Sequence, residues 1–543
     1  MRITGQDLVS SPRPTPLPPK ISPRPRRWPP KVTVAVMGVL LSLAFALGAL
    51  AQAQGWLAAL TVAENPRFQI ASTLQRSNLP TLYLDVEFQD AQKLKADRQN
   101  AQAAGVHITR PGEAVTATSR LGNDNIRVQV WLPSGQYAAD DWAFEITTQD
   151  QQGILGWHHV VLYDAASRRA LSQWGLSENL RREGILSAPV QPIQVIFNGD
   201  SLGVYGARAA PDELAAQNRL SGGLVYFDQT LYWQDLRRQR GSGPTPVSIN
   251  LSDCQVATVA TVNAGSSSAA LDRLHALQGG LRKPSDTLDV DQMGTLAALI
   301  SLWQGSPLDD WTRLMFYLDS SNDRLRPAAM ANLISAPGDG ALYWPPCFDD
   351  PLLQAAYVRA VERISQPEYL AQLRTALGGF EPMQLSFSAR GGKPELTWDE
   401  LAARQQRLAR WLEPTQMVLA SWALPSSASL TPASVLSVSL TNLQRVPVEV
   451  LGFDVGKSTF LPMDPAWIQD GSDLIISPSQ DSVILRAAGE GRLRALRLNV
   501  PYTTVFAVGR AASRDEQVEM RVVTRLWGLA RRQSAPMQQV GGE

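Results

Sequence analysis

The sequence predicts an α+β protein, because segments with strand character come first, segments with helix character follow, and strand character then returns. From residue 79 to residue 228, short apolar runs mostly alternate with polar residues, which is typical of half-buried strands. After Asp289, apolar residues recur at helical spacing over three long segments. From Met417 onward, short valine-rich runs are separated by Ser, Gly, Asp and Pro. Strands and helices in separate stretches of a chain favour an α+β arrangement over an alternating one.

The N-terminus predicts a membrane anchor. Residues 1–31 are rich in proline and basic side chains, and we expect them to form a disordered cytoplasmic tail. Residues 32–51 are an uncharged run of 20 residues, the length of a single helix that crosses a bilayer. The basic flank predicts that everything after this transmembrane helix is extracytoplasmic. The tripeptide at 49–51 also fits a cleavage site, so a removable signal peptide is the alternative, although the long basic region favours the anchor.

Composition shifts divide the remaining chain into four parts. We expect a linker at 52–78 and a domain at 79–416 in which strands precede helices. Residues 417–535 have the short, evenly spaced strands of an antiparallel β-sandwich, and 536–543 are expected to be a disordered tail.

Charge and cysteine content exclude several classes of partner. The 50 basic residues are balanced by 50 acidic ones, so we expect no nucleic-acid partner. Four histidines and two cysteines without a CxxC pair make a zinc site improbable. In an exported protein Cys254 and Cys347 could form a disulfide, and two buried thiols are an equal alternative.

Turn residues and periodicity place the elements of the first region. Asn198-Gly199 between two apolar runs is a strong hairpin signal, and we expect a hairpin over 194–210. A helix over 167–184 is expected to end at a glycine cap. The other segments are expected strands at 79–88, 125–132, 141–149, 157–163 and 222–228, a helix at 91–105, and loops at 239–250 and 263–268.

The later regions are predicted from the same two signals. Helices are expected at 289–305, 350–364 and 397–414. The sandwich strands are expected at 435–443, 446–455, 481–488, 493–502 and 518–529.

Seven phrases, in this order along the chain, carry a resemblance to a known family. The phrases are "LPTLYLDVEFQDAQKLKADRQNA", "DDWAFEI" before "LGWHHVVLYDAASR", "LSQWGLSENLRREGI", "VIFNGDSLGVYGA", "GGLVYFDQTLYW", "VDQMGTLAALISLWQG" and "RLRPAAMANL". Together they resemble the membrane-anchored bacterial branch of the spore-coat protein H (CotH) kinase-like family over residues 79–414. The resemblance implies an atypical two-lobed kinase-like domain, and the sandwich is similar to the tail of that branch.

The resemblance also implies functional groups that this chain lacks. Thr147 stands where the family has a lysine for the phosphates, and no lysine occurs between Lys95 and Lys283. Ala207 lies in the area where paired glutamates are expected after the hairpin tyrosine. Arg313 stands for an asparagine, and Ala331 replaces the aspartate with the metal-binding role. Phosphoryl transfer depends on such groups for placement and charge neutralisation, so their joint replacement predicts a pseudokinase.

We therefore expect no catalytic, cofactor-binding or metal-binding residues, and a role in binding or scaffolding with a protein partner at the cell surface. One alternative is a divergent active kinase that uses ATP and Mg²⁺, with Arg127, Asp309, Asp310 and Asp323 as substitutes. A second alternative is that the sandwich binds a glycan or another envelope component.

Two further pairs were weighed as sites. His158 and His159 are adjacent in a predicted strand, where neighbouring side chains face opposite ways, so they are not expected to share a metal. Asp212 and Glu213 follow Pro211, and this order predicts the first turn of a helix.

Overall fold

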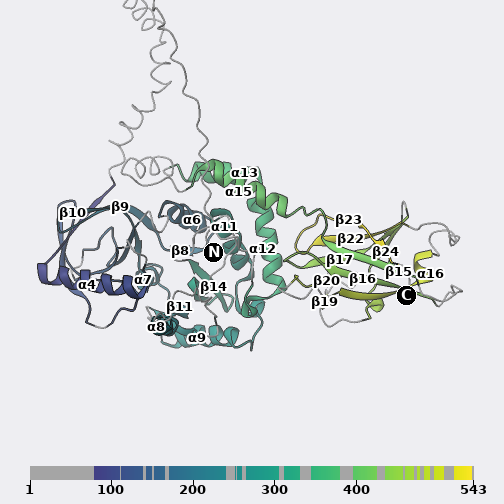
Figure 1. Ribbon diagram of the computed structural model, residues 1–543, viewed down its shortest axis with the longest axis horizontal. Coiled ribbons are helices and arrows are strands. Elements are labelled where there is room, and N and C mark those ends of the chain that lie inside the picture. Colours follow the sequence, from purple (N-terminus) through teal and green to yellow (C-terminus); the bar gives the residue numbers. More distant parts are fainter. Residues whose placement is uncertain are drawn as a thin grey trace, which may run out of the picture. The chain divides into compact units, whose positions relative to one another are not determined.

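The computed structural model confirms an α+β protein (Figure 1). It describes residues 79–540 except 111, 138–141, 150–151, 165–169, 240–250, 252–253, 260–263, 305–310, 330–343, 379–395, 425–433, 457–458, 470–473, 477–481, 489–494 and 507–518. The predicted tail, transmembrane helix and linker (1–31, 32–51 and 52–78), the loop at 239–250 apart from Gln239, and residues Asp309, Asp310 and Ala331 therefore lie outside the described residues. Among the described helices, none combines the length and the apolar character needed to cross a membrane.

The first strands form a closed barrel. Its strand order is β1-β3-β4-β6-β7-β10-β9, and β1 closes it by pairing in parallel with β9. The strands are β1 (Thr81–Val86), β3 (Val115–Leu121), β4 (Asp124–Trp131), β6 (Ala143–Thr148), β7 (His159–Asp164), β9 (Val190–Phe197) and β10 (Asp200–Ala209). Alternate residues point inward, as in β3, and make one apolar cluster around Leu84 and Phe144. The predicted strands of this region are confirmed, with shifted ends.

The helix α4 (Phe88–Ala104) follows β1 and ends at Gly105, whose φ is 64°. Leu94 and two alanines of α4 are buried. After the helix, β2 (Val106–His107) pairs with β5 (Gly135–Gln136) in a small separate ladder. The predicted helix at 91–105 is thus confirmed, and it begins three residues earlier than expected.

The predicted hairpin is β9–β10. Asn198 and Gly199 have φ angles of 49° and 86°, as the two central residues of a type I′ turn require. The Asn198 side chain also reaches the end of β1: its Oδ1 accepts the Val86 N–H at 2.7 Å and its Nδ2 donates to the Val86 carbonyl at 2.9 Å. One residue therefore makes the turn and fastens it to the strand that closes the barrel.

A five-stranded sheet and a group of helices form a second region, and the segment between β7 and β9 of the barrel contributes to it. The sheet order is β12-β11-β13-β14-β8, with β8 (Leu186–Ser187) parallel to β14 (Arg324–Ala329). The other strands are β11 (Leu224–Asp228), β12 (Gln255–Val259) and β13 (Met315–Asp319). The helices are α6 (Ala170–Arg182), α7 (Pro211–Gln217), α8 (Thr230–Gln239), α9 (Ala264–Gln278), α10 (Pro284–Thr287), α11 (Val290–Gln304), α12 (Pro351–Ile364), α13 (Pro367–Ala376) and α15 (Trp398–Trp411), with short 3₁₀ turns η3 (Trp311–Arg313) and η4 (Pro346–Phe348).

The helix α11 is the centre of this region, because most of its length is buried. Two glycines let neighbouring helices approach it closely. A Cβ on Gly294 of α11 would lie 2.5 Å from the Ala356 carbonyl carbon of α12, and a Cβ on Gly175 of α6 would fall within the Trp303 ring. Such close approach, to backbone at Gly294 and to an aromatic ring at Gly175, leaves no room for a Cβ.

One expected loop is wrong. Residues 264–268 of the loop predicted at 263–268 are the first turns of α9. The Ser267 side chain is buried and donates a 3.0 Å hydrogen bond to the Gly222 carbonyl. This tertiary contact stabilises a helical turn in a segment whose small polar residues favour a loop by composition. The helices expected at 167–184, 289–305, 350–364 and 397–414 are present as α6, α11, α12 and α15.

Two further sheets make up the C-terminal region. One has the order β21-β16-β15-β24 and the other β19-β20-β17-β22-β23, with β18 beside β17. The strands are β15 (Val418–Ala423), β16 (Val435–Asn442), β17 (Val448–Val455), β18 (Thr459–Pro462), β19 (Leu474–Ile476), β20 (Val483–Leu485), β21 (Ala495–Pro501), β22 (Met520–Leu526), β23 (Gln533–Pro536) and β24 (Gln538–Gln539), with η5 (Pro465–Trp467) and α16 (Tyr502–Phe506) between them. Buried residues of both sheets belong to one hydrophobic cluster.

The C-terminal tail corrects the sequence prediction. Residues 536–543 were expected to be disordered, whereas β24 pairs in parallel with Ser421 and Trp422 of β15. The pairing uses backbone groups on the edge of a sheet, which a polar sequence can supply without any apolar pattern.

Candidate functional site

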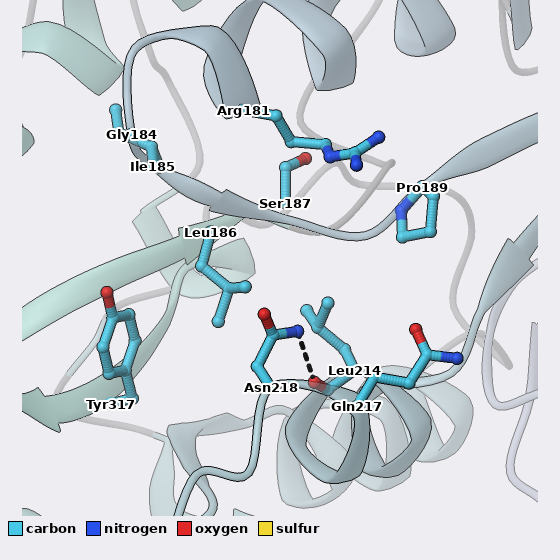
Figure 2. A pocket seen from close by; sticks show the side chains of 10 residues that line it. All are labelled: Arg181, Gly184, Ile185, Leu186, Ser187, Pro189, Leu214, Gln217, Asn218 and Tyr317. Atoms are coloured by element: carbon cyan, nitrogen blue, oxygen red, sulfur yellow. Dashed lines mark hydrogen bonds between the residues drawn. The ribbon is translucent and has the colours of Figure 1, made fainter.

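The candidate site is a pocket of about 520 Å³ between α6, β8 and α7 (Figure 2). Arg181 is at the end of α6, the chain then turns through β8, and α7 supplies the opposite side. Its lining residues are Arg181, Gly184, Ile185, Leu186, Ser187, Pro189, Leu214, Gln217, Asn218 and Tyr317.

The turn from α6 into β8 is built by a glycine. Gly184 has a φ of 75°, its N–H donates to the Arg181 carbonyl, and the Ile185 N–H donates to the Leu180 carbonyl. This αL end closes the helix and turns the chain directly into β8, as the predicted glycine cap requires. Arg181 and Ser187 consequently lie close together on one side of the pocket (Figure 2).

One part of the pocket lining is apolar. Leu214 is buried in a small cluster, and Leu186 and the Tyr317 ring pack against that cluster. Burial raises the pKa of the Tyr317 hydroxyl above its usual value, against the opposing effect of Arg326, so the phenol is neutral at ordinary pH. The pocket therefore offers apolar surface with a neutral aromatic ring.

The polar part combines one cation with hydroxyl and amide groups. Arg181 is half exposed and pairs with Glu178 on its own helix at 2.9 Å. The Asn218 Nδ2 donates to the Leu214 carbonyl at 2.8 Å, and the Gln217 Nε2 donates to Glu213 at 2.9 Å. These bonds orient the two amides, whose oxygens are hydrogen-bond acceptors and whose nitrogens each carry a second N–H. None of the ten lining residues is acidic.

The family positions identified from the sequence do not meet in this pocket. Thr147 is half-buried on β6, where it pairs with His159 of β7. Ala207 has no exposed surface and belongs to the apolar cluster inside the barrel, between Leu162 and Gln191 of the neighbouring strands. Arg313 is in η3, and Ala331 is outside the described residues.

The strand before Ala331 nevertheless runs beside the pocket. Ala329, the last residue of β14, pairs with Ser187, and Ser187 is a lining residue.

The substitutes proposed for an active kinase lie elsewhere. Arg127 is exposed on β4. Asp323 has a φ of 59° in the turn between β13 and β14 and forms an ion pair with Arg273 of α9. Neither residue lines the pocket. In the described segments, no group of three or more His, Cys, Asp and Glu side chains has an arrangement that could hold a metal.

The two cysteines form no disulfide with each other. Cys254 is buried, and Cys347 is partly exposed in η4. Burial raises the pKa of the Cys347 thiol to about 12, so this side chain is a neutral thiol and a poor nucleophile at ordinary pH.

A carboxylate–histidine–carboxylate cluster fixes the α7 side of the pocket. The His159 Nδ1–H donates to Asp212 at 2.7 Å, and its Nε2–H donates to Glu145 at 2.9 Å. Glu145 also accepts the Trp131 indole N–H at 3.1 Å. Glu213, which follows Asp212 in the chain, accepts the His158 backbone N–H at 3.0 Å. The first turn of α7 is therefore tied to β6 and β7 by two consecutive acids.

The charges of this cluster reinforce one another. Burial opposes a charge on His159, but the hydrogen bonds to Asp212 and Glu145 outweigh it and raise the pKa of the imidazole to about 9. Burial would likewise raise the pKa of Asp212, and the interaction with His159 lowers it below its ordinary value. A positively charged imidazole between two carboxylates is the form present at neutral pH.

Sequence reasoning singled out His158, His159, Asp212 and Glu213 but missed the cluster that they form with Glu145. The helix start at Asp212-Glu213 is confirmed. The His158 side chain contacts Thr148, whereas the His159 side chain contacts Asp212 and Glu145. Glu145 is on β6 and His159 is on the adjacent strand β7. Only the register between these strands in the barrel brings the two side chains together. The one available signal was an acid on an outward position of a predicted strand.

His159→Gln is expected to lower stability below pH 9 and to have little effect above it. Because the pKa of His159 is higher in the folded protein than in the unfolded chain, protonation of His159 stabilises the fold. This contribution is fully present below the unfolded-state pKa of about 6.5 and is lost as the pH rises through the folded-state pKa of about 9. Urea unfolding of wild type and variant at pH 6 and pH 10 measures the difference. The exposed neighbour His158→Gln is the matched control. A wild-type to variant difference that is equal at both pH values would contradict the charge assignment.

Comparison with known proteins gives no assignment for this site. No protein-family model matches the chain, and a search of the curated proteins returned no relative.

Proposed function

We propose that the protein is an exported CotH-like pseudokinase, held in the cell membrane by the predicted helix at 32–51, that acts as a binding or scaffold protein at the cell surface. In this proposal the barrel and the helical region together correspond to the strand-rich and helical lobes of an atypical kinase-like domain. The two C-terminal sheets form the proposed β-sandwich.

The observation that carries the proposal is the joint replacement, at Thr147, Ala207, Arg313 and Ala331, of the groups that the family resemblance implies for phosphoryl transfer. A site for phosphoryl transfer needs carboxylate or amide ligands for Mg²⁺ and a cation on the phosphates. The pocket beside β8 and β14 has one arginine, which is already paired with Glu178, and no acidic lining residue. A binding role needs none of these catalytic groups.

The residues of the family phrases that are present in this chain have structural roles. Asn198 makes the barrel turn and two hydrogen bonds to Val86. Phe316 is fully buried, and the Trp174 side chain packs against two core clusters. Side chains with such roles are kept by folding alone, without any need for catalysis.

The test is a nucleotide assay on the full chain in detergent. We expect no saturable thermal shift with ATP and Mg²⁺ up to about 1 mM, the upper end of usual substrate affinities, and no transfer of labelled phosphate to casein. An active protein kinase in the same assay is the positive control. Saturable ATP binding together with phosphate transfer would overturn the proposal and favour the active-kinase alternative.

A further inference from the structure

We propose that the pocket between α6, β8 and α7 binds one uronic-acid residue, that is, a hexose-sized sugar ring with a carboxylate. The inference rests on the proposed binding function and names a ligand class for the same pocket. The carboxylate pairs with Arg181, the ring lies against the apolar lining, and the hydroxyl groups donate to amide oxygens of the α7 side.

The size of the pocket suits a small ligand. Its volume of about 520 Å³ is in the lower part of the range for small-molecule sites. The space accommodates one sugar ring with ordered water.

The charge of the lining selects an anion. Arg181 is the one ionised side chain among the ten lining residues, and it is half exposed at the end of α6. A guanidinium presents a planar fork that matches a carboxylate in two parallel hydrogen bonds. Because Glu178 already balances part of this charge, one carboxylate is better matched than a polyphosphate, which would need several cations.

The remaining groups match the two faces of a sugar ring. Leu186 and the Tyr317 ring, which pack against the buried Leu214, provide apolar surface for the C–H groups. The side-chain nitrogens of Gln217 and Asn218 donate to Glu213 and to the Leu214 carbonyl, which orients the two amides. Their oxygens can accept hydrogen bonds from sugar hydroxyl groups. Figure 2 shows these two amides on the α7 side, with Arg181 on the α6 side.

The acceptors are held in place before a ligand arrives. Asp212 and Glu213 tie α7 to the barrel through His159 and the His158 backbone. The same Glu213 carboxylate orients Gln217. A pre-positioned set of acceptors reduces the entropy lost when a polar ligand binds.

Isothermal titration of the full chain with D-galacturonate tests the inference, with D-galactose as the neutral analogue. We expect saturable binding of galacturonate, no binding of galactose at the same concentrations, and at least about a tenfold loss of affinity in Arg181→Gln. Arg182→Gln is the matched control, because Arg182 is on the same helix, hydrogen-bonds to Gln372 and is absent from the pocket lining.

Tri-galacturonate separates two sources of the ligand. Tighter binding of the trimer than of the monomer would indicate a uronic acid within a surface polysaccharide, and equal binding would indicate a free sugar acid. The inference is overturned if galacturonate does not bind, if galactose binds equally well, or if Arg181→Gln binds like wild type. If neither galacturonate nor ATP binds, the sugar-acid inference fails and the pseudokinase proposal stands. The failure of one proposal is therefore distinguishable from the failure of the other.

Discussion

Ala207→Glu is expected to destabilise the barrel by about 4 kcal/mol or more. Ala207 has no exposed surface, and its side chain is within the apolar cluster of the barrel. Burial of a carboxyl group in such surroundings raises its pKa by about 3 units or more, and each unit corresponds to about 1.4 kcal/mol. Thermal and urea unfolding measure the loss. An acid at this position would therefore destabilise the fold itself.

Ser201→Glu provides the control for this experiment. Ser201 is on the same strand, β10, but its side chain is exposed, so the same substitution is expected to change stability by less than about 0.5 kcal/mol. If Ala207→Glu were as stable as Ser201→Glu, the inward orientation of Ala207 would be wrong.

Gly294→Val is expected to cost about 3 kcal/mol, because it separates the two most closely packed helices of the helical region. A Cβ at Gly294 would lie 2.5 Å from the Ala356 carbonyl carbon and 2.7 Å from the Tyr357 nitrogen. These are backbone atoms, which cannot move without shifting α12, and overpacking of this kind costs about 1–3 kcal/mol or more. The gain in helix propensity over glycine, less than about 1 kcal/mol, does not offset it.

Thr295→Val places the same side chain one residue further along α11, at a half-buried position, and is expected to be well tolerated. The midpoint of urea unfolding reports both variants. Equal midpoints for Gly294→Val and Thr295→Val would contradict close contact between α11 and α12.

Local signals predicted most elements, because those elements depend on local chemistry. The Asn198-Gly199 turn and the glycine cap of α6 need only residues that favour positive φ. The helix α11 has an apolar run long enough to identify it. The start of α9 was missed because its small polar residues are accommodated by the contact between Ser267 and Gly222, which is distant in sequence.

The candidate site was less accessible to sequence reasoning, because its members come from separate elements. Nothing in the sequence around Arg181 or Asn218 distinguishes them from other polar surface residues. Only the arrangement of α6, β8 and α7 places them around one pocket. The contact of His159 with Glu145 and Asp212 depends on the register of β6 with β7 and on the start of α7. Register of this kind is set by the closed barrel as a whole.

The parallel pairing of β1 with β9 has a consequence for how the chain folds during synthesis. The first strand of the barrel, Thr81–Val86, meets a partner, Val190–Phe197, that emerges more than 100 residues later. Until β9 and β10 have emerged, β1 and β7 are open edges that can pair with other chains. The two hydrogen bonds between Asn198 and Val86 then fasten this late closure. Nascent chains that stop before Val190 should accordingly be the aggregation-prone and protease-sensitive species in the life of this protein.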